Sequence, residues 1–384
     1  MIVLITQTFV LGGNRTHDLR HSSQGIPYGD VADNDPLGPA TPPPNFETPF
    51  EAFTDLELCP QLIDGELTGS LRCLQLNIYT PNDVTSGDKL PVMVYLHGGA
   101  FVGGEFTLSH FSPKFLVRHN VILVALHYRV GPYGFQCHNT TENRNQGLKD
   151  QILALKWVKK TIEYFGGNNQ SITLFGESAG AVSADIHLLY SEGLFDKAII
   201  QSGHAVSPNS IEDVDADTYT FDEHNVEDKV SIDRKNKPKE RSLRYYLKRN
   251  AVVYRYFFDY DGGRNFIKVA KNITSSGAAH GDDLGYLFDI SNTFNPEITE
   301  ADQLMIDRMT LLWTNFARYG DPTPESNELL PVKWLPTNVK ENYFDISSAT
   351  LHFGTPFKQP LSFWDYFYHK YAKNYRGINL HDID

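Results

Sequence analysis

Short apolar runs and one long amphipathic pattern alternate in the first half of the chain. Residues 76–79 and 92–96 are the first two predicted strands, and the continuous apolar run at 121–126 is typical of a central strand. Residues 148–165 place six apolar side chains on one helical face, namely Leu148, Ile152, Leu155, Val158, Ile162 and Phe165. The pair Gly166-Gly167 is predicted to end this helix. The order strand, helix, strand predicts a parallel sheet covered by helices.

Two further elements are predicted in the second half. Residues 252–260 are rich in β-branched and aromatic side chains, which favours a strand. Residues 304–319 follow a helical period that Gly320 is expected to stop. The proline-rich segment at 36–49 is predicted to be a surface loop, because proline fits neither a helix interior nor an inner strand.

The segment from 171 to 181 combines a buried strand, a serine flanked by glycines and a helix start. Gly176-Glu177-Ser178-Ala179-Gly180 fits the pattern G-x-S-x-G, in which the serine occupies a tight strand-to-helix turn. Such a turn exposes the hydroxyl of Ser178 and aims the backbone N–H of Ala179 at negative charge beside it. The pentapeptide by itself also fits an ordinary Gly-Ser turn, so other parts of the sequence must show whether Ser178 is catalytic.

A glycine-rich loop after an earlier predicted strand supplies that context. The strand leads into His97-Gly98-Gly99-Ala100-Phe101, where small residues let successive backbone N–H groups converge on one point. This is the pattern of an oxyanion hole of the His-Gly-Gly type. The alternative is a flexible glycine loop without a chemical role.

Together these stretches resemble the type B carboxylesterase and cholinesterase family, and their sequences are most similar to those of insect carboxylesterases. The same resemblance extends over most of the chain, through residues 25–28, 73–81, 128–135, 145–151, 201–203 and 254–371. It implies the α/β-hydrolase fold, an α/β architecture with a central, mostly parallel sheet flanked by helices. We therefore expect a single domain at 25–377, preceded by a segment at 1–24 that does not resemble the family.

A serine hydroxyl needs a base to become a nucleophile at neutral pH. Among 14 histidines, His280 matches the family's Gly-x-x-His-x-x-Asp/Glu motif within residues 275–288. The resemblance implies that His280 takes the proton of Ser178 during attack and returns it to the leaving alcohol. Without the resemblance, His280 would rank only slightly above His97.

The acid of the expected triad is not identified. The family's glutamate lies in a motif resembling Gly-x-Asn-x-x-Glu-Gly, which this chain does not contain. The resemblance thus implies that a block with the acid and several helices is missing, and that the fold is incomplete. Residues 206–245 fill the interval with charges typical of a solvated surface, and a substitute acid between Asp213 and Glu223 is an alternative. Asp282 and Asp283 lie too close to His280 in sequence to be preferred.

Composition sets outer limits on partners. The formal net charge of −13 argues against nucleic acid and anionic membrane surfaces. No apolar run is long enough to span a bilayer, and residues 1–11 are apolar but lack the basic start of a signal peptide. Neither Cys/His ligand spacing nor a phosphate-binding glycine loop is present, so no metal or organic cofactor is implied.

Cysteines and asparagines favour secretion. The resemblance implies a disulfide between Cys59 and Cys73, which forms in oxidising compartments and leaves Cys137 over. Asn139, Asn169 and Asn272 begin glycosylation tripeptides, a pattern that is also common by chance.

The function expected from the resemblance is hydrolysis of a small carboxylic ester through an acyl-enzyme. Ser178 would attack the carbonyl, and the N–H groups of Gly99, Ala100 and Ala179 would hold the oxyanion. One alternative is a non-catalytic, esterase-like binding or adhesion protein. Another is a juvenile-hormone esterase, although Glu177 stands where that subgroup usually has glutamine.

Overall fold

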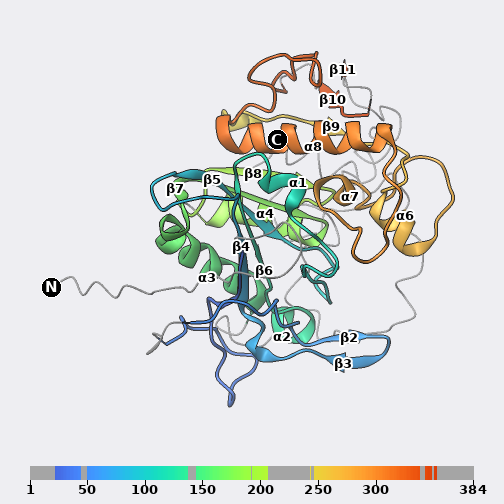
Figure 1. Cartoon of the computed structure of the whole chain (residues 1–384). Coiled ribbons are helices and arrows are strands. Elements are labelled where there is room, and N and C mark those ends of the chain that lie inside the picture. Colours follow the sequence, from blue (N-terminus) through green and yellow to red (C-terminus); the bar gives the residue numbers. More distant parts are fainter. Residues whose placement is uncertain are drawn as a thin grey trace, which may run out of the picture.

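A six-stranded, mostly parallel sheet forms the centre of the molecule (Figure 1). The computed structural model describes residues 22–44, 50–136, 144–191, 193–205, 243, 246–337, 342–347 and 350–352. The strands lie in the order β1 (Ser22–Pro27), β4 (Gln75–Tyr79), β6 (Ile122–Leu126), β5 (Leu90–Leu96), β7 (Gly167–Glu177) and β8 (Lys197–Gln201). β5 to β8 are parallel to one another, whereas β4 is antiparallel to both of its neighbours, β1 and β6. The predicted parallel sheet is confirmed, but β1 precedes the strand that was expected to be the first.

Alternation along the central strands separates two hydrophobic cores, because successive side chains of a strand point to opposite faces. Met93 and Tyr95 of β5 join one core with α1 (Lys114–Val117), α7 (Leu284–Leu287) and α8 (Glu300–Tyr319). Val92 and Val94 join the other core with α3 (Gln146–Thr161) and α4 (Ala179–Tyr190). Figure 1 shows α3 and α8 on opposite sides of the strands. Helices therefore cover both faces of the sheet.

The predicted helix at 148–165 is present, and three of its six predicted apolar side chains, Leu155, Val158 and Ile162, are fully buried. It consists of α3 and a 3-10 turn, Ile162–Phe165, and Gly166 ends it with a φ of 81°. Leu148 and Ile152 are only half-buried, whereas Asp150 and Gln151 are fully buried. The burial of these two polar residues was not predicted, because it depends on their buried partners Arg129 and His187.

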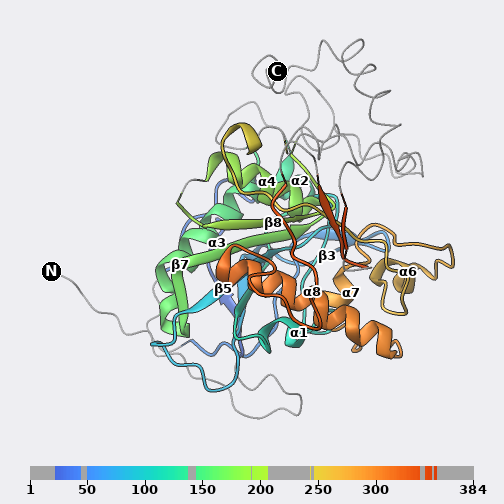
Figure 2. The same cartoon turned by 90° about the horizontal axis from the view of Figure 1, so that it is seen from above.

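The second half departs further from the prediction. Of the predicted strand at 252–260, only β9 (Tyr256–Phe257) forms, in a separate sheet with β10 (Tyr343–Asp345) and β11 (Thr350–His352). α8 begins four residues before position 304, because Thr299 and Asp302 form a capping box, and it ends at Gly320 as predicted. Figure 2 shows α8 next to the strands β5 and β7 of the main sheet.

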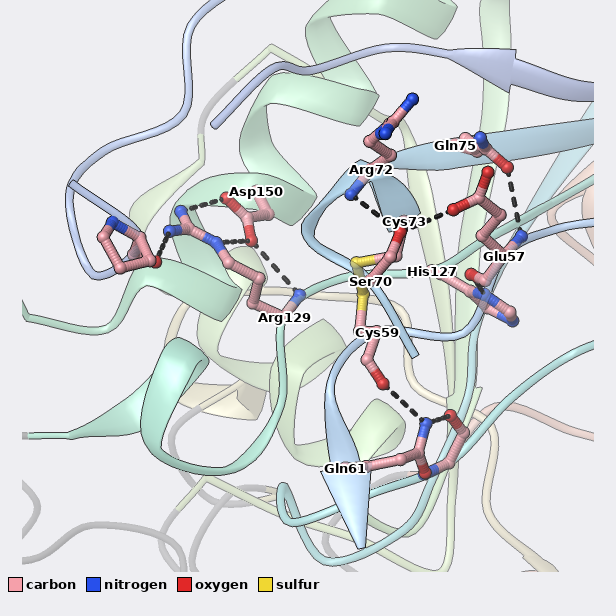
Figure 3. The surroundings of a disulfide bond; sticks show 12 residues. Glu57, Cys59, Gln61, Ser70, Arg72, Cys73, Gln75, His127, Arg129 and Asp150 are labelled. Carbon is pink, nitrogen blue, oxygen red and sulfur yellow. Dashed lines mark hydrogen bonds and ion pairs between the residues drawn. A yellow bond between two sulfur atoms is a disulfide. The ribbon is translucent and has the colours of Figure 1, made fainter. Parts of the chain in front are cut away.

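The structure joins Cys59 to Cys73, which confirms the disulfide that the resemblance implied (Figure 3). The bond closes the base of the hairpin formed by β2 (Gln61–Ile63) and β3 (Glu66–Thr68). Gln61 donates to the carbonyl of Cys59 and accepts from the N–H of Gly104, at 2.8 Å. The disulfide thereby fixes a hairpin that contacts the glycine loop after β5.

Several expectations concern residues outside the described ranges. These are Cys137, Asn139, residues 1–11 and nearly all of the charged segment at 206–245. Asn169 is half-buried on β7, and Asn272 is exposed after α6 (Phe266–Lys271). Within the described ranges, no helix combines the length and the apolar character that crossing a membrane requires.

His187 on α4 predicts a loss of stability in mild acid. Burial lowers its pKa from 6.5 to about 4, and its ring contacts Gln151 and Ser191. Between these two pKa values the unfolded chain binds a proton that the native chain does not, so the free energy of unfolding falls as the pH falls. We expect a loss on the order of 2 kcal/mol between pH 7 and pH 5 from this group. Urea titrations at both pH values should show a smaller difference in His187→Gln, and an equal difference would contradict the assignment.

Candidate active site

Ser178 occupies a strained turn between β7 and α4. Its φ of 55° and ψ of −121° lie outside the regions that side chains normally adopt. The N–H of Ser178 donates to the carbonyl of Gln201 at 2.9 Å, which ties the turn to the end of β8. A Cβ on Gly180 would lie 2.0 Å from the carbonyl oxygen of Leu96, so only glycine fits there. This is the geometry that the G-x-S-x-G pattern predicted.

His280 lies directly against the serine, although 102 residues separate them. Its Nε2 is 2.8 Å from Oγ of Ser178. The preceding residue, Ala279, donates its N–H to the buried carboxylate of Asp282, which also accepts from the N–H of Lys268 at 3.0 Å. The carboxylate of Asp282 therefore holds the loop that carries His280, and the imidazole is within reach of the hydroxyl proton.

The glycine loop after β5 lies beside the serine. A Cβ on Gly98 would stand 3.0 Å from Cβ of Ser178, which leaves no room for a larger residue without movement. Gly99 and Ala100 have φ values of 116° and 54°, and both are exposed. Ala179 directly follows Ser178 and is the first residue of α4. The structure thus places Gly98, which precedes Gly99, and Ala179 beside Ser178, and the oxyanion role of Gly99, Ala100 and Ala179 stays a prediction.

His97 is buried under the glycine loop and supports it, so it is not placed to act as the base for Ser178. It is 2% exposed, stacks on Tyr128 at 4.3 Å between ring centroids, and its Nδ1 is 2.8 Å from the carbonyl oxygen of Gly98. Burial lowers the pKa of His97 to about 3, with a further contribution from His127. A ring that stays neutral at physiological pH supports the loop without titrating.

Glu177 is a neighbour of the histidine whose role sequence reasoning missed. Its Oε1 is 3.2 Å from Nε2 of His280, and its side chain is 7% exposed. Burial raises the pKa values of Tyr95 and Tyr128, and the charge of Glu177 raises them further. The sequence signal for this role is the position of Glu177 directly before the candidate nucleophile Ser178. The sequence analysis uses Glu177 only to distinguish general carboxylesterases from juvenile-hormone esterases.

None of the carboxylates that the structure describes near His280 is shown in the position of the orienting triad acid. Glu177 approaches Nε2, the same ring nitrogen that meets Ser178, whereas an orienting acid accepts from Nδ1. Asp282 is engaged by backbone N–H groups, and Asp283 accepts from Nε2 of Gln201 at 2.8 Å. The stretch from Asp213 to Glu223 lies outside the described residues. Among the residues that the structure describes, no group of three or more His, Cys, Asp or Glu side chains is suited to a metal ion.

Comparison with protein families gives a match over most of the chain. The model of the carboxylesterase family matches residues 1–225 and 214–364. The two matches meet within the charged segment at 206–245.

Curated relatives match about half of the chain. "Acetylcholinesterase 1" of Caenorhabditis elegans is 43% identical over 211 residues, which are 49% of this chain and 33% of the relative. "Pyrethroid hydrolase Ces2a" of Mus musculus is 45% identical over 161 residues, 41% of this chain and 29% of the relative. "Juvenile hormone esterase" of Tribolium castaneum is 39% identical over 198 residues, 48% of this chain and 33% of the relative. The chain thus spans about a third of the length of these relatives.

Among solved structures, juvenile hormone esterase from Manduca sexta with OTFP covalently attached superimposes with a TM-score of 0.70. The match covers 91% of this chain and 95% of that one, at 22% sequence identity. At this identity the likeness concerns the fold, and the predicted α/β-hydrolase architecture is confirmed.

Proposed function

Because the chain belongs to the carboxylesterase family, we propose that it hydrolyses small carboxylic esters through an acyl-enzyme on Ser178. The observation that carries the proposal is the 2.8 Å contact between Nε2 of His280 and Oγ of Ser178. A strained, partly exposed serine that contacts an imidazole is the arrangement of an activated nucleophile. Homologous proteins named as esterases and hydrolases support the same reaction class.

The proposed chemistry has two steps. His280 takes the hydroxyl proton while Oγ of Ser178 bonds to the ester carbonyl carbon. The backbone N–H groups of Gly99, Ala100 and Ala179 stabilise the oxyanion, and the alcohol leaves with the proton from His280. Water, deprotonated by His280, then attacks the acyl-enzyme and releases the carboxylic acid and the free serine.

Glu177 is proposed to stabilise the imidazolium that forms in each step. Its carboxylate lies 3.2 Å from Nε2 of His280, within the range where an opposite charge favours the protonated ring. It acts on the charge of the ring rather than on its orientation. Glu177 would therefore replace part of what a triad acid contributes.

Substituting Glu177 by glutamine tests this role, because it keeps the shape and removes the charge. We expect kcat/KM for p-nitrophenyl acetate to fall by about 10- to 100-fold. The acid limb of the pH profile should move to lower pH, since the protonated ring loses a favourable interaction. Glu163→Gln on the exposed 3-10 turn is the matched control. An unchanged profile in Glu177→Gln would remove Glu177 from the mechanism.

Labelling with a fluorophosphonate tests the proposed function itself. The probe bonds to a serine only when a neighbouring base makes the hydroxyl nucleophilic. Intact mass should increase by one adduct in the wild-type chain and not in Ser178→Ala. Folded wild-type protein that remains unlabelled would favour the non-catalytic binding protein instead.

Secretion is proposed from the covalent features. The disulfide between Cys59 and Cys73 persists in oxidising compartments, and Asn272 is exposed at the start of a glycosylation tripeptide. Mobility of the secreted chain before and after treatment with an N-glycosidase would test this proposal.

A further inference from the structure

Gln61, the first residue of β2, has a buried polar side chain that the proposed mechanism does not use. The residue is 8% exposed, and its amide group forms hydrogen bonds through both of its polar atoms. Nε2 donates to the carbonyl oxygens of Cys59 and Gly104, both at 3.2 Å, and Oε1 accepts the N–H of Gly104 at 2.8 Å. Figure 3 shows the amide directed at the carbonyl of Cys59. These bonds hold the side chain of Gln61 in one orientation.

The backbone that carries Gln61 is anchored to the main sheet. The disulfide joins Cys59, two residues before Gln61, to Cys73, two residues before β4 begins. On its other side, Gln61 pairs with Thr68 across the hairpin of β2 and β3. The position of the Gln61 amide is therefore fixed relative to β4.

Gly104, the residue that the amide binds, packs directly against the start of the glycine loop. A Cβ on Gly104 would lie 2.1 Å from the carbonyl oxygen of Gly98 and 2.5 Å from Nδ1 of His97. A Cβ on Gly99 would lie 2.1 Å from the carbonyl oxygen of Gly103, whose N–H donates to the carbonyl of Gly99 at 3.2 Å. Backbone segments in such close contact transmit displacements to one another. A shift of Gly104 would thus move both ends of the loop.

The start of this loop is the part that lies beside the nucleophile. A Cβ on Gly98 would stand 3.0 Å from Cβ of Ser178, and Gly99 and Ala100 are predicted to donate to the oxyanion. Ala100 has a φ of 54°, a conformation that a non-glycine residue keeps only where the surrounding structure holds it. An oxyanion hole is effective because its donors are in place before the reaction. The loop therefore needs a support from outside, and Gln61 supplies one at Gly104.

We propose that Gln61 is a positioning residue of the oxyanion hole. Its amide holds Gly104, and the contacts of Gly103 and Gly104 with the start of the loop hold the N–H groups of Gly99 and Ala100 where the oxyanion forms. The inference rests on the proposed function and adds to it a residue far from Ser178 in the sequence. Because Gln61 acts through the backbone, it should affect the transition state and leave ester binding unchanged.

Two substitutions of Gln61 test the proposal. Gln61→Met keeps the length of the side chain and removes its hydrogen bonds, whereas Gln61→Glu keeps an acceptor for the N–H of Gly104 and places an oxygen against two carbonyl oxygens. We expect kcat for p-nitrophenyl acetate to fall by about 10- to 100-fold in both, less than the loss of an oxyanion donor costs. KM should stay within about twofold of wild type.

Two exposed residues provide the controls. Gln170→Met makes the same change of side chain on β7, and Leu67→Ala weakens the hairpin on β3 without touching the amide of Gln61. Both chains should hydrolyse the ester at the wild-type rate. A loss of kcat in Leu67→Ala equal to that in Gln61→Met would overturn the proposal, because the effect would then belong to the hairpin as a whole.

A hexyl trifluoromethyl ketone separates positioning from a merely structural role. Oγ of Ser178 bonds to its carbonyl carbon, the hydroxyl proton passes to His280, and the carbonyl oxygen takes the electron pair and becomes an oxyanion. The affinity for this ketone should fall in both Gln61 variants by the same factor as kcat/KM. A rise in KM with kcat and the ketone affinity unchanged would overturn the proposal.

Hydrogen exchange distinguishes this inference from the proposed function, because it needs no turnover. Peptides that cover residues 98–106 should exchange at least about tenfold faster in Gln61→Met than in the wild-type chain or in Gln170→Met. Faster exchange in chains that hydrolyse no ester would support Gln61 as the residue that holds the glycine loop, and would overturn the proposed function alone. Unchanged exchange in Gln61→Met that melts cooperatively would overturn the proposal.

Discussion

Replacing Ser178 by alanine is expected to lower kcat for p-nitrophenyl acetate by at least about 10²-fold. In serine proteases the loss of the nucleophile costs about 2 × 10⁶, whereas the loss of the acid alone costs about 3 × 10⁴. These effects are not additive. A chain in which no acid orients His280 would begin from a lower rate and would lose about the quotient of the two. The size of the loss therefore reports how well His280 is held.

The comparison uses initial rates at saturating ester, with the melting curves of both chains recorded. Ser86→Ala is the matched control, because Ser86 is exposed in the loop between β4 and β5. A loss near 10⁶ would mean that a carboxylate orients His280 as in a full triad. Equal rates in Ser178→Ala and wild type would exclude Ser178 as the nucleophile.

The second large effect is expected on stability, from the substitution Arg129→Ala. Arg129 forms two charge-assisted hydrogen bonds to Asp150, at 2.8 and 2.7 Å, and both side chains are completely buried. Burial raises the pKa of Asp150 and the guanidinium opposes this shift, so removing Arg129 leaves an uncompensated acid in the core. We expect the free energy of unfolding to fall by about 3 to 5 kcal/mol.

Urea denaturation of both chains measures this loss. Arg118→Ala provides the control, because Arg118 pairs with Asp307 on the surface and should contribute no more than about 1 kcal/mol. The double variant Arg129→Met with Asp150→Leu should recover part of the loss, since neither charge then remains buried. A change below about 1 kcal/mol in Arg129→Ala would show that the buried pair does not hold α3 against the loop after β6.

The elements around Ser178 were predictable because local signals and tertiary packing agree there. The run at 121–126 became a central strand, and Gly166 and Gly320 ended the helices predicted before them. At the elbow, the carbonyl of Leu96 requires glycine at position 180, the second residue of α4, and the motif encodes this glycine directly. His280 was found by its motif, since no local pattern places it beside a serine 102 residues away.

What could not be predicted depends on partners far along the chain. Asp150 and Gln151 are buried because Arg129 and His187 reach them, and hydrophobic periodicity does not register such pairs. The strand expected at 252–260 shortened to two residues because it pairs only with β10 among the described strands. The contact of Glu177 with His280 likewise follows from the turn geometry of Ser178 rather than from residue type.

The most direct measurement is the burst of p-nitrophenol in the first turnover of p-nitrophenyl acetate, compared between the wild-type chain and His280→Gln. Acyl-enzyme formation on Ser178, with His280 as the base at 2.8 Å, predicts a burst approaching one equivalent per folded chain in the wild type. His280→Gln should show no burst on the same timescale. A burst of equal rate and amplitude in the variant, or none in folded wild-type protein, would contradict an acyl-enzyme mechanism that depends on this pair.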